Sequence, residues 1–367
     1  MKRARPLLIL STLLLLNISS VIMVEANVTN ISPSCTIFTV AIGDTVFFGN
    51  NEDWYTQKLR LWFIPSQIVS TMGGTRSIYG GVYIGFLNEE KEELYLNCCG
   101  GMNEHGLVFD INGLPSVSLY DNPNGSSFWT NGICNIHASI WDCKNVEEVI
   151  EWYKSYKWDT SMGGQIHYGD ATGDAVVVSV DPSTHKLAFT RKTGNFIVST
   201  NFNLNDSRNA YDYPCGRYNT ATEMLGEIDS EENLTVQACA DILYAVRMTG
   251  GGCHTLYSNI FDLVNLDLYL NYGEDYQLQK KVNLLDELSQ QESFELFDIS
   301  YMTGVEGNLL IKSVKIDEDF FPPITPTTTP TTPRTPPSPS FYILPLTTVS
   351  VVFIASGVYV YKKRRVV

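Results

Sequence analysis

The hydrophobic pattern at the start of the body of the chain predicts a β-hairpin. Residues 36–42 are almost all apolar or β-branched, Gly43 and Asp44 interrupt this run, and residues 45–48 resume it. Two such runs joined by two turn-forming residues are typical of a hairpin. Because neither run alternates cleanly with polar positions, we expect strands that are covered on both faces, as in a layered sheet.

The two-residue turn fixes how the strands of this hairpin pair. Counting outward from the turn places Cys35 opposite Glu52, within the polar run 50–53. Opposed residues in an antiparallel pair lie about 5 Å apart. The start of the first strand is therefore expected to be lined by polar side chains.

Later hydrophobic patterns predict an α+β body whose strands are arranged in layers. Asn145 and Glu148 form a capping box, and apolar residues at helical spacing follow them. The expected helices cover 145–153, 217–226 and 235–247, and the further expected strands cover 91–98, 106–112, 165–169, 174–180, 186–198, 255–273 and 308–315.

The N-terminal end of the chain has the pattern of a secretory signal. Basic residues precede the apolar run 7–24, and a small-residue cleavage pattern follows it. We expect a signal peptide at 1–26 and a short propeptide at 27–34. The alternative is an uncleaved membrane anchor, which would leave Cys35 internal.

The C-terminal end predicts a stalk and a single transmembrane helix. The linker 317–340 is rich in proline and threonine, a composition that cannot bury a core. Residues 341–361 form an uncharged apolar run that is long enough to span a bilayer. Because basic residues concentrate on the cytoplasmic side, we expect the basic tail 362–367 inside the cell and the body 35–316 outside it, at the cell membrane.

The charge of the body excludes one class of partner. The formal net charge is −15, and seven basic residues and one acidic residue lie in the two ends, so 18 basic and 39 acidic residues remain and the body carries about −21. Binding to a nucleic-acid backbone is therefore not expected. Five glycosylation sequons fit an exported glycoprotein, at Asn27, Asn30, Asn124, Asn205 and Asn233.

Eight cysteines lie in the body of the chain, at positions 35, 98, 99, 134, 143, 215, 239 and 253. In an exported protein most of them are expected in disulfides, but if one is a working thiol, at least one more stays free. Their spacing matches no zinc-binding pattern. We therefore expect neither a metal nor any other cofactor.

A cysteine exposed as a new N-terminus would carry its own base. No histidine of the chain lies in a Cys/His protease signature. If the bond between Ser34 and Cys35 is cut, Cys35 gains an α-amino group with an ordinary pKa of about 7.7 to 8.0. That amine lies on the same residue as the thiol and can accept its proton. Asp53 is the carboxylate that the hairpin places near this amine.

Several segments, in this order along the chain, resemble one enzyme family. They are Cys35-Thr-Ile-Phe, Gly49-Asn-Asn-Glu-Asp-Trp54, Gly101-Met-Asn-Glu-His-Gly-Leu107 with Asn112 after it, 168–178, Val198-Ser-Thr-Asn201, Cys215-Gly-Arg217-Tyr218 and 255–263. The family is the linear-amide C–N hydrolases, an N-terminal-nucleophile group that includes choloylglycine hydrolase, penicillin V acylase and isopenicillin N acyltransferase. The resemblance spans about residues 35–275.

The resemblance implies a four-layer αββα sandwich and a set of site residues. Cys35 would be the nucleophile through its sulfur and the base through its amine, and Asp53 would hold that amine. Asn112 and Asn201 would donate to the oxyanion. Arg217 would fix the electrostatics of the cysteine.

One position departs from the resemblance. Asn50 occupies a place where bile-salt and penicillin acylases carry arginine, which puts their substrates in doubt and favours the broader acyltransferase-like branch. The resemblance also implies that the propeptide 27–34 is removed by autocleavage with the same groups.

Three functions remain open from the sequence. The first is hydrolysis of a linear, non-peptide amide of a small N-acyl substrate through a thioester on Cys35. The second is an acyltransferase that hands the same acyl group to an amine. The third is a stalked surface receptor or adhesin that keeps the same sandwich but lacks activity. The sequence leaves the oligomeric state open and is compatible with a homo-oligomer.

Overall fold

The computed structural model describes residues 34–55, 58–71, 74–86, 97–127, 135–249, 253–272, 279–298, 305–306, 308–316 and 320. The chain divides into two units, 1–323 and 324–367, and the described residues all belong to the first. The predicted signal peptide, membrane span and basic tail lie outside the described residues, as do nearly all of the propeptide and the linker. Within the described part, none of the helices has both the length and the apolar character needed to cross a membrane.

The predicted hairpin is present with the predicted pairing. Strand β1 (Ser34–Ile42) pairs antiparallel with β2 (Thr45–Trp54), and Cys35 lies opposite Glu52. The turn between them depends on Gly43, whose φ of +60° favours glycine.

A second observation also requires glycine at this turn. A Cβ atom on Gly43 would collide with the carboxylate of Glu231. That carboxylate accepts hydrogen bonds from the backbone nitrogen of Asp44 at 2.9 Å and the hydroxyl of Thr45 at 3.0 Å. The hairpin end is thus tied to a loop that is far away in sequence.

The hairpin lies inside a six-stranded sheet with the order β13-β1-β2-β14-β15-β16. The other members are β13 (Phe196–Ser199), β14 (His254–Asp262), β15 (Asp267–Tyr272) and β16 (Gln279–Asn283). Strand β2 pairs with the whole of β1, whereas β13 pairs only with Ile37–Val40. Beside the start of β1, the segment just after β13 takes its place, and Cys35 is buried there.

A larger sheet faces the first one, with the order β12-β11-β10-β8-β7-β6-β3-β19-β17 and the short β9 paired to β10. Its strands are β3 (Leu59–Ile64), β6 (Gly81–Phe86), β7 (Asn97–Asn103), β8 (Val108–Asp121), β9 (Ser126–Ser127), β10 (Tyr156–Gly169), β11 (Ala175–Asp181), β12 (Lys186–Arg191), β17 (Glu295–Asp298) and β19 (Asn308–Ile316). A three-stranded sheet combines β18 (Val305–Glu306), β4 (Gln67–Thr71) and β5 (Gly74–Ile78).

The described helices are α2 (Asn135–Asp142), α3 (Val146–Ser155), α4 (Gly216–Gly226), α5 (Val236–Ala245), α6 (Leu284–Ser289) and the 3₁₀ turn η1 (Gln291–Ser293). The predicted capping box begins α3, where the Asn145 side chain accepts from the Glu148 backbone nitrogen.

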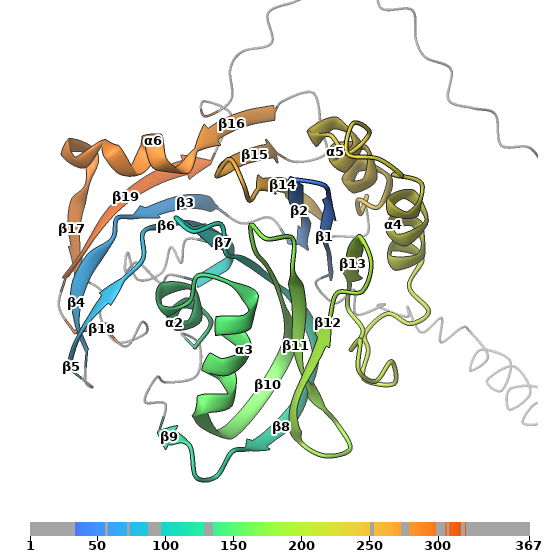
Figure 1. Cartoon of the computed structure of the whole chain (residues 1–367), viewed down its shortest axis with the longest axis horizontal. Helices are drawn as coiled ribbons and strands as arrows, with labels where there is room; N and C mark the ends of the chain where they lie inside the picture. Colours follow the sequence, from blue (N-terminus) through green and yellow to red (C-terminus); the bar gives the residue numbers. More distant parts are fainter. Residues whose placement is uncertain are drawn as a thin grey trace, which may run out of the picture. The chain divides into compact units, whose positions relative to one another are not determined.

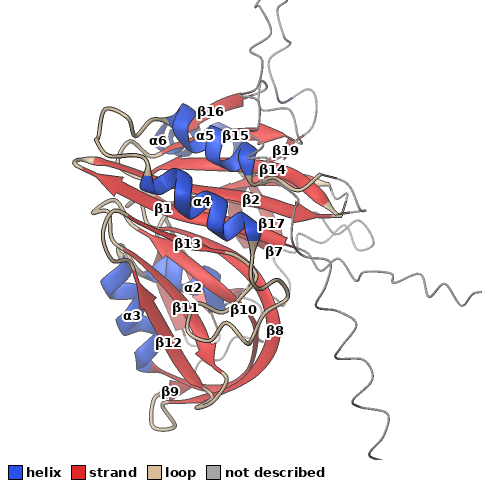
Figure 2. Cartoon of the chain, turned by 90° about the vertical axis from the view of Figure 1, so that its right-hand side faces the viewer, coloured by secondary structure: helices blue, strands red, loops and turns tan. Residues whose placement is uncertain are grey.

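Three separate hydrophobic cores show that the body has four layers. One core packs α4 and α5 against β1 and β2, the second fills the space between the two sheets, and the third packs α2 and α3 against the larger sheet. Figures 1 and 2 show these helices on the outer faces of the two sheets. The order of layers is α, β, β, α, as the family resemblance implied.

The predicted strand 186–198 is wrong as a single element. The structure breaks it into β12 and β13, which belong to different sheets. The break is a turn in which Gly194 has a φ of +75°, and this glycine lets the chain pass from one layer to the next. The predicted late group of strands at 255–273 is the hairpin of β14 and β15, and the strand expected at 106–112 begins at Val108 and continues to Asp121. Of the predicted strand 91–98, residues 91–96 lie outside the described residues.

The expectation of mostly paired cysteines is not met in the described part of the chain. Cysteines 35, 143, 215, 239 and 253 form no disulfide there. Cys143 and Cys239 lie in the helix-facing cores, where they pack as small apolar side chains.

Candidate active site

The alternation of β1 and β2 divides the site between two faces of the six-stranded sheet. Ile37 and Phe48 pack between the sheets, whereas Phe38 packs against the helices. Since successive side chains of a strand point to opposite faces, Cys35 and Glu52 face the larger sheet. Ser34 and Asp53, the adjacent opposed pair, face the helix layer.

The backbone nitrogen of Cys35 is held by Asn201, which lies just after β13. This nitrogen is the amide of the uncut Ser34–Cys35 bond, and it donates to Asn201 Oδ1 at 2.9 Å. Arg217 Nη2 donates to the same oxygen at 3.1 Å. Because both neighbours are donors, the oxygen of the Asn201 amide must face them, and its Nδ2 donates to the carbonyl of Gly113 at 3.0 Å. In the uncut chain this orientation differs from the oxyanion donor that the resemblance implied.

Arg217 contacts most of the groups around Cys35. It lies in the first turn of α4, and its Nη1 donates to the Cys35 carbonyl at 3.0 Å and to the Thr36 hydroxyl at 3.0 Å. Its Nη2 also donates to the Ser34 hydroxyl. The planar guanidinium can make these bonds at once because its donors are fixed in a fork.

Asp53 is fully buried and lies between Arg217 and Thr255. Its Oδ2 is 3.4 Å from Arg217 Nη1, and its Oδ1 accepts from the Thr255 hydroxyl at 2.5 Å. Burial raises the pKa of Asp53 to about 7, although Arg217 and Thr255 act to lower it. Asp53 is opposite Ser34, so it lies beside the nitrogen side of Cys35 and on the other face from the sulfur.

Asn112 reaches the site from the larger sheet. It lies on β8, and its Nδ2 donates to the Cys35 carbonyl at 3.3 Å. Its Oδ1 is buried and has no hydrogen-bond partner among the described residues. The structure thus brings Cys35, Asp53, Asn112, Asn201 and Arg217 together, although they are spread over more than 180 residues of sequence.

Glu52 and Asp110 are two further site residues that the sequence did not single out. The thiols of Cys35 and Cys99 and the side chain of Asn50 act to lower the pKa of Glu52, whose Oε2 is buried without a hydrogen-bond partner among the described residues. Burial and the nearby Asp53 charge nevertheless raise the pKa of Glu52 to about 8. The hairpin register already placed Glu52 opposite Cys35, and this was the signal from which its contact with the thiol could have been inferred.

Asp110 adds a second acid to the space between the sheets. It lies on β8, is buried, and accepts a hydrogen bond from the backbone nitrogen of Ile111 at 2.7 Å. Burial and the charge of Glu52 raise its pKa. In turn, burial and the charges of Glu52, Asp53 and Asp110 raise the pKa of the Cys35 thiol well above its ordinary value. In the uncut chain this thiol is therefore protonated at neutral pH.

Asn50 leaves the site without the positive charge that arginine would bring at this position. Its Nδ2 donates to Asn259 Oδ1 at 3.3 Å, and both residues are fully buried. In the part of the chain that the structure describes, the Arg217 guanidinium is the cation that contacts residue 35, and it does so from the helix side.

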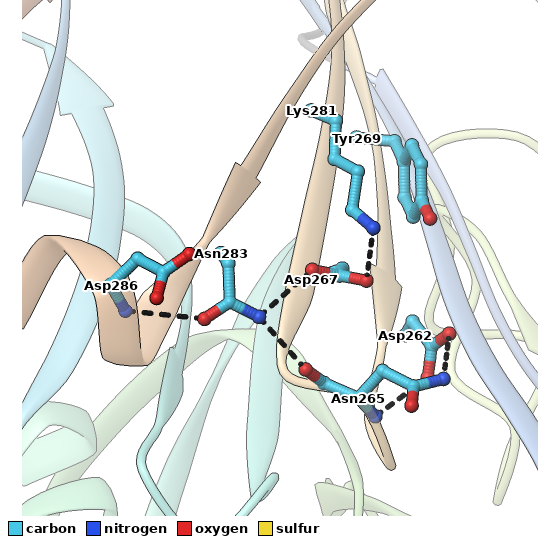
Figure 3. A pocket seen from close by; sticks show the side chains of 7 residues that line it. All are labelled: Asp262, Asn265, Asp267, Tyr269, Lys281, Asn283 and Asp286. Atoms are coloured by element: carbon cyan, nitrogen blue, oxygen red, sulfur yellow. Dashed lines mark hydrogen bonds and ion pairs between the residues drawn. The ribbon is translucent and has the colours of Figure 1, made fainter.

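A polar pocket lies away from Cys35, at the turn between β14 and β15 (Figure 3). It is lined by Asp262, Asn265, Asp267, Tyr269, Lys281, Asn283 and Asp286. Asp267 pairs with Lys281 at 2.7 Å and accepts from Asn283 at 2.9 Å, so its charge is already compensated. Asp262 is five residues along β14 from the residue opposite Glu52, or about 17 Å. This pocket is not part of the Cys35 site.

The buried acids are expected to make the folded protein less stable as pH rises from about 6.5 to about 8. Glu52 keeps its proton up to a pKa of about 8 when folded, against 4.5 ordinarily, so in this interval the folded state binds more protons than the unfolded state. Each extra proton bound by the folded state lowers the free energy of unfolding by about 1.4 kcal/mol per pH unit of increase. The lowered pKa of buried His167, about 3, acts in the opposite direction only below 6.5. Urea unfolding across this interval should show the fall, and Glu52→Gln should reduce it; an unchanged slope would contradict the assignment.

The family model described as acyl-coenzyme A:6-aminopenicillanic acid acyl-transferase matches residues 40–276, more than half of the chain. A search of curated protein sequences finds no significant match.

Two solved proteins have similar folds. A conjugated bile acid hydrolase from Clostridium perfringens, in two mutant forms, gives TM-scores of 0.54 at 17% identity and 0.51 at 15% identity, each covering 77% of this chain and 97% of that one. Penicillin V acylase from Agrobacterium tumefaciens gives a TM-score of 0.52 at 15% identity, covering 70% of this chain and 88% of that one. At these identities the likeness concerns the fold.

Proposed function

The chain belongs to the acyl-coenzyme A:6-aminopenicillanic acid acyl-transferase family, among the linear-amide C–N hydrolases with an N-terminal nucleophile, and we propose that it hydrolyses a linear, non-peptide amide through a thioester on Cys35. The nucleophile is exposed when the chain cuts its own Ser34–Cys35 bond. The reaction needs no metal and no other cofactor.

One observation carries this proposal. Asn112, Asn201 and Arg217 come from three different elements, and all three bond to the backbone of Cys35. A structural cysteine would have no need of three convergent polar contacts on its own carbonyl and nitrogen. Such convergence is typical of a residue whose position must be fixed for chemistry.

The bond to be cut is held from both sides in the uncut chain. The Ser34 hydroxyl donates to Asn201 Oδ1 at 3.0 Å and accepts from Arg217 Nη2. The nitrogen of Cys35 is bonded to the same Asn201. The groups that hold the end of the propeptide 27–34, called the leader below, are therefore the groups that will surround the free amine once the leader has left.

After the cut, Cys35 supplies both reacting groups. Its α-amine takes the thiol proton, the sulfur attacks the carbonyl of the substrate amide, and the protonated amine returns the proton to the leaving amine. Water then releases the acyl group from the thioester. Asn201 and Asp53 hold the amine, and Asn112 Nδ2 is the side-chain donor available for the oxyanion on the sulfur side.

The substrate is proposed to be a small N-acyl amide rather than a bile salt or a penicillin. The conjugated bile acid hydrolase and the penicillin V acylase share the fold, but Asn50 leaves no arginine at this place in the present site. The proposed setting is the outer side of the cell membrane, with the C-terminal span 341–361 as anchor and the tail 362–367 in the cytoplasm.

Product analysis is the experiment that tests this function. The exported protein is incubated with a panel of N-acyl amides, with and without an added primary amine, and the products are identified by mass spectrometry. We expect free carboxylic acid in both cases, because water resolves the thioester. Absence of turnover and of acylation at Cys35 across the panel would support a non-catalytic surface protein instead.

The alternative activity is acyl transfer, and the family description favours keeping it in view. It uses the same thioester, so the distinction lies in the second step. New amide formed from the added amine, at the expense of free acid, would replace hydrolysis by acyl transfer as the main reaction.

A further inference from the structure

The self-cleavage proposed above requires a base that the mature mechanism does not provide. In the uncut chain the Cys35 nitrogen is an amide, which already donates to Asn201 and does not accept protons at ordinary pH. The thiol is protonated, because burial and three nearby acids raise its pKa. Some other group must therefore take the thiol proton before the leader can be removed.

Glu52 is the side chain in position to do so. It lies opposite Cys35 on the neighbouring strand and on the same face of the sheet. Both side chains are buried, and the thiol interacts with the Glu52 carboxylate closely enough to act on its pKa. A base must lie close to the proton that it removes, and two opposed side chains on one face of a sheet are placed for this.

Asp53 and His167, two other titratable groups nearby, are engaged elsewhere, whereas Asp110 acts on the thiol through its charge. Asp53 points to the opposite face, where it bonds to Thr255 and Arg217. Both ring nitrogens of His167 are hydrogen-bonded at 2.9 Å, one to Thr39 and one to Ser199. Neither residue is therefore available to the thiol.

We propose that Glu52 is the base that removes the thiol proton of Cys35 when the uncut chain cleaves its own Ser34–Cys35 bond. This inference rests on the proposed function, because it concerns how the nucleophile becomes exposed. It assigns to Glu52 a catalytic role in maturation that is separate from the role of the α-amine in turnover.

The atoms of this step balance with one water molecule. The proton moves from Cys35 Sγ to the Glu52 carboxylate, and the sulfur attacks the carbonyl carbon of Ser34 through a five-membered ring. The C–N bond breaks, the nitrogen takes the proton from Glu52 and becomes the α-amine of Cys35, and the leader is now a thioester on Sγ. Water hydrolyses the thioester, releasing a leader that ends in the Ser34 carboxylate and restoring the thiol.

The surroundings of Glu52 make it a stronger base than an ordinary carboxylate. The titratable groups that interact with it are Cys35 on β1, Cys99 on β7, Asp110 on β8 and Tyr257 on β14, together with Asp53, which is adjacent on its own strand and points to the other face. Burial, followed by the charge of Asp53, raises its pKa to about 8. About one Glu52 side chain in ten is then ionised at neutral pH, and self-cleavage should become faster as pH rises toward 8.

A pulse-labelled cleavage assay on the full chain tests the proposal. Wild type, Glu52→Gln and Glu52→Asp are synthesised in a cell-free system, chased at pH values from about 6 to about 8.5, and the uncut and cut forms are separated by mass. Removing a general base costs about 10²-fold or more, so Glu52→Gln should be cut at least about 100 times more slowly. Glu52→Asp keeps a carboxylate and should recover part of the rate.

The matched control is Glu231→Gln, the same change in a loop residue that bonds to the turn at the other end of the hairpin. Glu231 bonds to Asp44 and Thr45 at the turn and is far from the thiol, so this variant should be cut at the wild-type rate. Circular dichroism of each variant shows whether it is folded. In wild type the rate should rise toward pH 8, and in Glu52→Gln this rise should be absent.

The outcomes separate this inference from the proposed function. If wild type is cut at Cys35, and Glu52→Gln is cut at the same rate with the same pH profile, then Glu52 is not the base, whereas the proposed function stands. If wild type itself remains uncut while fully active, self-exposure of Cys35 is wrong and this inference falls with it. Should Glu52→Gln misfold, the rate and pH profile of Glu52→Asp decide the question, because a shortened base predicts a slower but still pH-dependent cut.

Discussion

Replacing Cys35 with alanine should abolish amide turnover and leave the leader attached. Loss of a nucleophile in enzymes of this kind lowers kcat by about 10⁴-fold or more, since no neighbouring group can form the acyl intermediate. Intact-mass measurement should find wild type beginning at Cys35 and the variant still uncut at that position. Steady-state kinetics on an active N-acyl amide gives the turnover.

The control for this prediction is Cys239→Ala. Cys239 is also a buried free thiol, but it lies on α5 in the core between that helix and the six-stranded sheet. Its removal should change neither the N-terminus nor kcat. Turnover of Cys35→Ala near the wild-type rate would rule out the thioester mechanism.

Replacing Arg217 with methionine should lower kcat/KM by about 10²-fold or more, because Ser34, Cys35 and Asn201 lose the group that positions them. It should also destabilise the fold by about 3 kcal/mol, since Asp53 would be left buried without its cation. The pKa of Asp53 should rise further, as Arg217 is the main group that lowers it. Asp53 would then keep its proton to higher pH when folded, and the loss of stability with rising pH would continue above 7.

Two further variants make the Arg217 result specific. Arg217→Lys keeps the charge but not the fork of donors, so it should recover part of the stability and less of the activity. Arg208→Met removes an exposed arginine that pairs only with Asp206 in the described structure, and it should match wild type. Kinetics and urea unfolding measure both effects. If Arg217→Met and Arg208→Met behave alike, the assigned position of Arg217 in the site is wrong.

The hairpin at the centre of the site could be predicted from local sequence. A two-residue turn and strand periodicity fix the pairing, and the structure places Cys35 opposite Glu52 as counted. The capping box of α3 was equally local. Local rules succeed here because neighbouring residues alone decide these contacts.

The convergence of Asn112, Asn201 and Arg217 could not be derived in this way. These contacts join β8, the end of β13 and α4, and no pattern along the chain specifies which layers come together. Family resemblance supplied these residues, and the structure supplied their geometry. Their catalytic roles stay predictions until the variants above are measured.

Two differences between the predictions and the structure depend on which face a side chain enters. The run 50–53 predicts one polar cluster, but alternation sends Glu52 to the sulfur and Asp53 to the helix side. The run 186–198 predicts one strand because its hydrophobicity continues through a turn that is marked by Gly194. In both cases the missing information was which layer each side chain enters.

The nitrogen and the sulfur of Cys35 contact different layers of the protein. The nitrogen lies with Asn201 and Arg217, while the sulfur lies with Glu52 on the side of β8. Under the proposed mechanism, substitutions on α4 would change the surroundings of the amine, and substitutions on β8 would change the surroundings of the sulfur. Substrate preference and proton transfer could then be altered separately in this scaffold.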